Sequence, residues 1–131
     1  ARIRMTALYQ IAQFNKGIVV GTGNKVEDFG VGFFTKYGDG GVDISPIADC
    51  MKTEVWHMGR LLGVNEEIIA AAPTDGLWDD GRSDEEQLGM TYVDLEMAMA
   101  GMGPIGNIDK FRELQRKNLH KMNPIPVCKV N

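Results

Sequence analysis

The sequence predicts an α/β fold in which one short strand, belonging to a parallel sheet, is flanked by helices that make up most of the chain. Residues 18–20, Ile-Val-Val, are a wholly apolar run of β-branched residues, which is typical of a buried parallel strand. Apolar residues recur at helical spacing near both ends of the chain. Because one strand cannot form a sheet, we expect its neighbours to come from another chain or from residues outside this sequence.

Size and composition are those of one globular domain. The chain has 131 residues, of which 44% are hydrophobic and 24% charged. Its net charge of −4 offers no basic field for nucleic acid. No apolar run approaches the ~20 residues that span a bilayer, and no signal peptide is recognisable, so a cytoplasmic protein is expected. Cys50 and Cys128 have no metal-site spacing, and buried reduced thiols are favoured over a disulfide.

The first half of the chain contains four predicted elements. A helix begins at the first residue and ends before the segment 13–17, and the strand follows at 18–20. Residues 21–24 lead to a helix that begins near Lys25. The next helix is expected to start at Ser45-Pro46, with serine as N-cap and proline in the first turn, and to end at Gly63.

The second half consists of shorter helices and one longer one. Asn65 opens a helix that runs through Ile69, and residues 74–84 are rich in Asp and Gly and predict a long loop. Ser83 with Glu86 forms a capping box, and the pattern Thr-x-x-Asp at 91–94 opens another helix. Pro104 begins the last helix. The segment 123–127 is expected to be extended because of its prolines.

The segment 34–46 is the strongest candidate for function. Lys36, Asp39 and Asp43 surround a glycine-rich turn, where glycines allow close backbone approach. The charged groups offer partners for a phosphate, a ribose hydroxyl or a cation. A solvated turn before a helix explains the same residues, and this short motif does not decide between the two.

Thr22 and Glu27 follow the predicted strand, at the edge where open α/β sheets bind ligands. Thr22 is placed to donate to a nucleotide, and the Glu27 carboxylate is of the type that Mg²⁺ prefers. The structural alternative makes Thr22 a helix cap and Glu27 a first-turn partner of the helix dipole. Further polar residues stand near loops or at helix ends, namely Arg2, Arg4, Lys52, Thr74 and His120-Lys121.

Together these segments resemble ammonia-dependent NAD synthetase, over nearly the whole chain. Each piece alone is weak, but their order and spacing are specific. The matching segments are Ala-Arg-Ile-Arg-Met at 1–5, Val-Val-Gly-Thr at 19–22 with Glu27, Gly-Phe-Phe-Thr-Lys-Tyr-Gly-Asp-Gly-Gly-Val-Asp-Ile at 32–44, Ala-Pro-Thr-Asp at 72–75, Asp84-Glu85, Leu-Gly-Met-Thr-Tyr at 88–92, and His120-Lys121.

The resemblance implies an adenine-nucleotide α-hydrolase-like fold, which is Rossmann-like, and a specific reaction. Deamido-NAD, ATP and ammonia give NAD, AMP and pyrophosphate: ATP adenylylates the nicotinate carboxylate, and ammonia displaces AMP. A homodimer is implied as well. Residues 74–86 match a mobile loop expected to order over the nucleotide and exclude water.

The resemblance also implies roles for individual residues. Glu27 matches a ligand of Mg²⁺, and Lys52 and Asp39 are expected to serve the chemistry, with Asp39 helping to place ammonia. The residues that match ATP contacts are Thr22, Lys52 and Thr74. The residues that match deamido-NAD contacts are Arg2, Lys36, Asp43, His120 and Lys121.

Several departures from the family pattern bear on these expectations. The family's N-terminal half, with its Ser-Gly-Gly-x-Asp-Ser phosphate loop, has no counterpart here, so residues 1–131 are expected to be the C-terminal part of one synthetase domain and inactive alone. Gly23 stands where acidic residues are common, and Met122 where arginine is frequent. One extra residue lies between Glu27 and Phe33. A glutamine-dependent synthetase and a non-catalytic nucleotide-binding or dimerisation domain are the alternatives.

Overall fold

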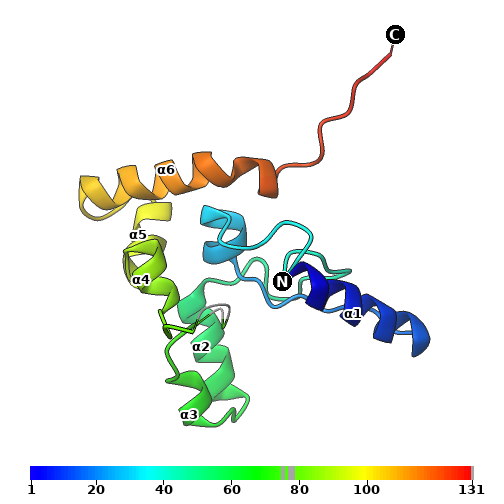
Figure 1. The fold of residues 1–131 in the computed structure, drawn as a ribbon. Coiled ribbons are helices and arrows are strands. Elements are labelled where there is room, and N and C mark those ends of the chain that lie inside the picture. The colour runs from blue at the N-terminus through cyan, green and yellow to red at the C-terminus, as the bar shows by residue number, and fades with distance from the viewer. Residues whose placement is uncertain (75, 77–78, 131) are drawn as a thin grey trace.

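The computed structural model describes residues 1–74, 76 and 79–130. Helices make up nearly all of the regular structure (Figure 1). In chain order they are α1 (Arg2–Phe14), the π-helix η1 (Lys25–Val31), α2 (Lys52–Leu61), α3 (Glu66–Ile69), α4 (Asp84–Leu88), α5 (Tyr92–Met99) and α6 (Ile105–Met122).

The core lies where η1 packs against α5 and α6. Figure 1 shows η1, in cyan, beneath the long α6, with α5 on the adjacent side. The buried side chains of this cluster are Val26, Val31, Leu88, Met90, Tyr92, Leu95, Ala98 and Phe111. Removing this apolar surface from water is what holds the three helices together. The helix that carries Glu27 is therefore fixed by the best-packed part of the molecule.

The helix α1 is confirmed in its predicted place but packs little. None of its 13 residues is buried, and it projects from the body of the molecule (Figure 1). Ile3 and Phe14 are 89% and 84% exposed. The amphipathic pattern of this helix therefore has no complete partner among the described residues.

The predicted buried strand is not confirmed among the described residues. Among the described residues, the segment 18–20 forms one parallel bridge, between Val20 and Ile44, and no strand is assigned. Val19 is buried, whereas Ile18 and Val20 are 60% and 53% exposed. A strand of a parallel sheet is covered on both faces and paired along its edges. In the described part of the chain, the α/β class is therefore represented by its helices. The segment 18–20 is extended but does not belong to a sheet.

The helix expected from Ser45-Pro46 begins later, at Lys52. Residues 46–49 form a turn, and Lys25 N donates to Cys50 O at 2.9 Å. This bond ties the chain to the start of η1 before α2 can begin. The Glu54 carboxylate then accepts from Met51 N at 2.7 Å and caps the new start. Lys52 consequently lies in the first turn of α2.

A π-helix replaces the α-helix expected after Lys25. Asn24 caps its start, because Oδ1 of Asn24 accepts from the N–H groups of Val26 and Glu27, both at 3.0 Å. Gly32 ends it with a φ of 66°. A π-turn holds more residues per turn than an α-turn.

The remaining helices follow the sequence patterns closely. Asn65, Ser83 and Thr91 cap α3, α4 and α5 as predicted, and α6 begins directly after Pro104. Both cysteines are free thiols, but they are not buried: Cys50 is half-buried and Cys128 is exposed in the extended tail. None of the helices in the described part of the chain has the length and apolar character to cross a bilayer.

Candidate functional site

Glu27 and Lys52 form a mostly buried ion pair at the centre of the candidate site. Lys52 Nζ lies 2.9 Å from Glu27 Oε1, and the two side chains are 17% and 13% exposed. The π-helix η1 supplies the carboxylate, and the first turn of α2 supplies the ammonium. Two charges so far removed from water are stable only because each compensates the other.

Further polar groups surround the Glu27 carboxylate. The Tyr92 hydroxyl donates to Glu27 Oε1, and the Asn24 amide donates to Glu27 Oε2. The hydroxyl also lies 3.3 Å from Asp84 Oδ2. Burial, helped by the charges of Glu27 and Asp84, raises the pKa of Tyr92 above its ordinary value, so the hydroxyl keeps its proton. Glu27 is thus held in one orientation by donors from three elements.

A second carboxylate, that of Asp28, lies beside this pair. Burial, followed by the negative charges of Glu27 and Asp39, raises its pKa to about 7. The carboxylate stands over Gly23, where any Cβ would collide with it. Gly23 therefore leaves room for an acidic group that arrives from the next helix.

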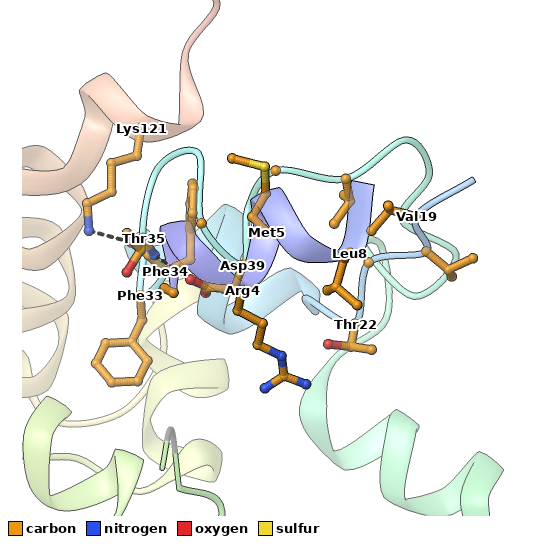
Figure 2. Close-up of a pocket in the computed structure, with 16 residues that line it drawn as sticks. Arg4, Met5, Leu8, Val19, Thr22, Phe33, Phe34, Thr35, Asp39 and Lys121 are labelled. Carbon is orange, nitrogen blue, oxygen red and sulfur yellow. Dashed lines mark hydrogen bonds between the residues drawn. The ribbon is translucent and has the colours of Figure 1, made fainter. Parts of the chain in front are cut away.

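A cavity of about 600 Å³ lies between α1, the segment 19–22 and the loop 33–42, and its lining does not include Glu27 or Lys52. Figure 2 shows Arg4 and Asp39 at its centre, Thr22 at one end, and Lys121 at the other end, reaching toward Phe34 and Thr35. Its walls combine apolar side chains with a few charged ones, as ligand pockets commonly do.

The loop 33–42 is anchored to the end of α6 by two lysines. Lys121 Nζ donates to Gly32 O at 2.9 Å and to Phe34 O at 2.8 Å, while Lys36 Nζ donates to His120 O. Arg2 Nε of α1 donates to Lys36 O at 3.1 Å. Four of the residues expected at the deamido-NAD end are thereby brought together from three separate parts of the chain. Burial lowers the pKa of Lys121 from its ordinary value.

The other predicted site residues are more dispersed. Thr22 and Asp39 line the cavity, and Asp39 Oδ1 accepts from Thr35 N at 3.0 Å. Asp43 is exposed and accepts from Val19 N at 2.7 Å, outside the cavity lining. Thr74 is exposed on its loop, and within the described ranges no hydrogen bond joins it to Lys52. The loop predicted over 74–86 includes residues 75, 77 and 78, which lie outside the described residues.

Glu27 offers a single carboxylate of the type that magnesium prefers, and its oxygens accept hydrogen bonds from Lys52, Tyr92 and Asn24. No group of three metal-ligating side chains occurs in the described ranges, so a cage made wholly of protein ligands is not present there. Magnesium commonly binds through one or two carboxylates together with phosphate oxygens and water. Lys52 already compensates the charge of this carboxylate, so a magnesium ion would share Glu27 with the ammonium group.

The sequence patterns assigned no role to Asn24, Asp28, Asp84 or Tyr92. Asn24 stands at a helix start, which was a recognisable signal for a cap but not for a contact to Glu27. Tyr92 lies 65 residues from Glu27 in the sequence, and only the packing of α5 against η1 makes them neighbours.

This chain matches the family model described as NAD synthase over residues 1–124. It belongs to the NAD synthase family. A relative from Carboxydothermus hydrogenoformans, an NH(3)-dependent NAD(+) synthetase, is 46% identical over 92% of this chain and 49% of its own length. The corresponding protein of Methanococcoides burtonii is 47% identical over 92% of this chain and 51% of its own. The chain thus spans about half the length of these relatives.

Two solved structures of similar proteins agree with this assignment to the NAD synthase family. NMN synthetase from Francisella tularensis superposes with a TM-score of 0.91 and 33% identity, over 99% of this chain and 54% of that protein. The NH3-dependent NAD synthetase of Campylobacter jejuni, solved with a nitrate ion, gives a TM-score of 0.70 and 25% identity over 98% and 52%. The helical arrangement described above is therefore one that members of the family share.

Proposed function

We propose that the protein containing this chain is an ammonia-dependent NAD synthetase. It would amidate deamido-NAD with ammonia and convert ATP to AMP and pyrophosphate. The observation that carries the proposal is the mostly buried Glu27–Lys52 pair, which joins two positions 25 residues apart at 2.9 Å. The chain belongs to the NAD synthase family, and its relatives include NH(3)-dependent NAD(+) synthetases. Both facts support a role for this pair in binding ATP and its metal ion.

The ATP end of the site is formed by four residues in this proposal. Glu27 would hold Mg²⁺, and Lys52 would approach the phosphates with its ammonium group. The hydroxyls of Thr22 and Thr74 would donate to the nucleotide. When bound, magnesium neutralises the phosphate charge that grows as pyrophosphate departs.

The deamido-NAD end is formed by the loop 33–42 and its neighbours. Lys36 and Lys121 are held close to the loop backbone, and Arg2 and His120 lie next to them. The positive charges of Arg2, Lys36 and Lys121 suit the phosphates of a dinucleotide. Asp43 would bind the same substrate, and Asp39, exposed in the loop, would help to place ammonia at the activated carboxyl carbon.

A mononucleotide substrate is the second candidate. The structural match to NMN synthetase has the higher TM-score, 0.91 against 0.70, and the higher identity, 33% against 25%. In that case the same site would amidate the carboxylate of the mononucleotide, and no residue would be needed to bind a second nucleotide. The relatives with 40% identity or more that carry the NAD synthetase name favour the dinucleotide.

The wider setting of the enzyme remains part of the proposal. We infer that residues 1–131 form the C-terminal part of one synthetase domain, that the enzyme is a homodimer, and that it acts in the cytoplasm. The apolar side chains exposed along α1 support an interface on that side.

The deciding experiment is an assay of the full-length protein with ATP, Mg²⁺, ammonium and deamido-NAD. NAD and AMP should form in equal amounts, and E27Q and K52M should each lose at least a hundredfold in kcat/KM, because charge stabilisation at the phosphates is lost. The exposed substitution E113Q is the matched control. Faster amidation of the mononucleotide would favour the second candidate.

Three other results would replace the proposal. Equal or better use of glutamine as the nitrogen donor would indicate a glutamine-dependent synthetase. Unchanged turnover in E27Q and K52M would remove these residues from the site. An intact full-length protein that forms no amide with ammonium would exclude the synthetase function and leave a nucleotide-binding or dimerisation domain.

A further inference from the structure

Tyr92 touches both charged groups of the site, although neither motif nor spacing assigns it a function. It is the first residue of α5 and is 1% exposed. Its hydroxyl donates to Glu27 Oε1, and Lys52 Nζ lies over its ring, 4.8 Å from the ring centre. One side chain thus contacts the carboxylate through its polar end and the ammonium through its aromatic face.

The ring of Tyr92 is itself fixed by its neighbours. Trp56 of α2 packs edge-on against it, with ring centres 5.8 Å apart and an angle of 83° between the planes. The backbone N–H of Tyr92 donates to Glu85 Oε1 at 2.8 Å, which ties the start of α5 to α4. A residue held in this way has little rotational freedom, so its hydroxyl presents a donor in a fixed direction.

The carboxylate of Asp84 is a second acceptor near the Tyr92 hydroxyl. Its Oδ2 lies 3.3 Å from the Tyr92 oxygen, and Asp84 N donates to Pro73 O at 2.9 Å. The buried Asp84 therefore links the end of the predicted nucleotide loop to the tyrosine that holds Glu27. Because a tyrosine hydroxyl carries a single proton, it makes its strong hydrogen bond to one carboxylate at a time, and here the closer one is Glu27.

We propose that Tyr92 is a positioning residue of the synthetase site. Its hydroxyl orients the Glu27 carboxylate toward the metal, and its ring keeps the Lys52 ammonium beside that carboxylate. The inference rests on the proposed function, since it assumes that Glu27 binds Mg²⁺. Partners that orient a metal ligand typically change metal affinity by about 10- to 100-fold when they are removed.

The test uses Y92F in the full-length protein, because phenylalanine keeps the ring and removes only the hydroxyl. Mn²⁺ is the probe, and its binding is measured by electron paramagnetic resonance in the presence of a non-hydrolysable ATP analogue. We expect the dissociation constant for Mn²⁺ to rise about tenfold or more. The kcat should fall, while KM for deamido-NAD stays within about twofold. E113Q is the matched control, and it should bind Mn²⁺ as the wild type does, because Glu113 is exposed on α6.

The second variant, Y92L, removes the ring as well. It should raise KM for ATP in addition, because Lys52 loses the aromatic face that holds it. If Y92L does not fold, Y92F alone decides. Wild-type Mn²⁺ affinity and kcat in Y92F, with or without a loss of thermal stability, would overturn the inference and leave Tyr92 a packing residue. A wild-type protein without synthetase activity would instead overturn the proposed function, and this inference with it.

Discussion

Gly32 lies where η1, α6 and the loop 33–42 meet, and its missing side chain is what allows them to meet. Its φ is 66°, in the left-handed region, and a Cβ there would lie 2.5 Å from Asn118 Cβ. Asn118 Nδ2 donates to Val31 O at 2.9 Å, and Lys121 Nζ donates to Gly32 O. The residues that anchor the candidate substrate loop to α6 therefore depend on one glycine.

Replacing Gly32 by alanine should destabilise the protein more than the same replacement at a left-handed glycine with open space around it. The strain of a positive φ costs about 1–2 kcal/mol, and the clash with Asn118 adds about 1–3 kcal/mol. Urea denaturation of G32A measures the sum. G63A is the matched control, because Gly63 has a φ of 73° and nothing within 4 Å of its Cβ position. Equal losses in the two variants would show that the close approach of α6 does not matter.

The helix α5 fixes the position of the start of α2. Its first turn is held by Glu96 of α5, whose Oε1 accepts from Thr53 N at 3.0 Å and whose Oε2 accepts from Thr53 Oγ1 at 2.7 Å. Lys52 is the neighbouring residue. Because Glu96 and Tyr92 lie one turn apart on α5, the same helix places Glu27 and Lys52 relative to each other.

Removing the Glu96 carboxylate should loosen the start of α2. E96A is expected to lower the free energy of unfolding by about 1 kcal/mol, the usual cost of a lost helix cap. Hydrogen exchange of the Thr53 amide should quicken, and KM for ATP should rise as Lys52 moves. The control E113A, at an exposed position of α6, should change stability by less than about 0.5 kcal/mol. Unchanged exchange at Thr53 would contradict the role given to Glu96.

At the scale of the whole molecule, this chain exposes more apolar surface than a self-contained domain would. Large apolar side chains are exposed on α1, at the end of α2, on α3, at the start of α6 and in the segment that follows α6. The most exposed are Ile3, Phe14, Leu61, Leu62, Ile68, Ile105, Ile125, Val127 and Val130. Extensive exposed apolar surface marks places where a protein meets a partner or another part of its own fold.

We therefore expect residues 1–131, expressed alone, to associate with themselves. Sedimentation velocity at rising concentrations should show a growing average mass. The double variant I11E/F14E should reduce the association, because these α1 side chains are 59% and 84% exposed. T6E/Q10E adds the same two charges to α1 without removing apolar surface, and it should leave most of the association. A single monomeric species at all concentrations would show that the exposed apolar surface does not drive self-association.

Most of the helices could be predicted from local signals. Asn65, Ser83, Thr91 and Pro104 stand at helix starts in the sequence and in the structure, because a cap needs only residues within one turn. The start of α2 could not be predicted in this way. Ser45-Pro46 satisfies the local rule, yet Lys25 and Glu96 place the helix six residues later through contacts distant in sequence. Likewise, the strand at 18–20 had the right composition but has no neighbouring strands among the described residues.

The sequence by itself determined the positions of most helix caps, which follow from residue type and spacing, and the family, whose resemblance made Glu27, Lys52, Lys36 and Lys121 candidates. Only the tertiary structure decided that Glu27 pairs with Lys52, that Tyr92 holds both, and that the two other lysines bind backbone carbonyls around the loop 33–42. The physical reason is that desolvated charges take the partners that packing brings within reach, and the packing of η1 against α5 and α6 joins segments that are 65 or more residues apart.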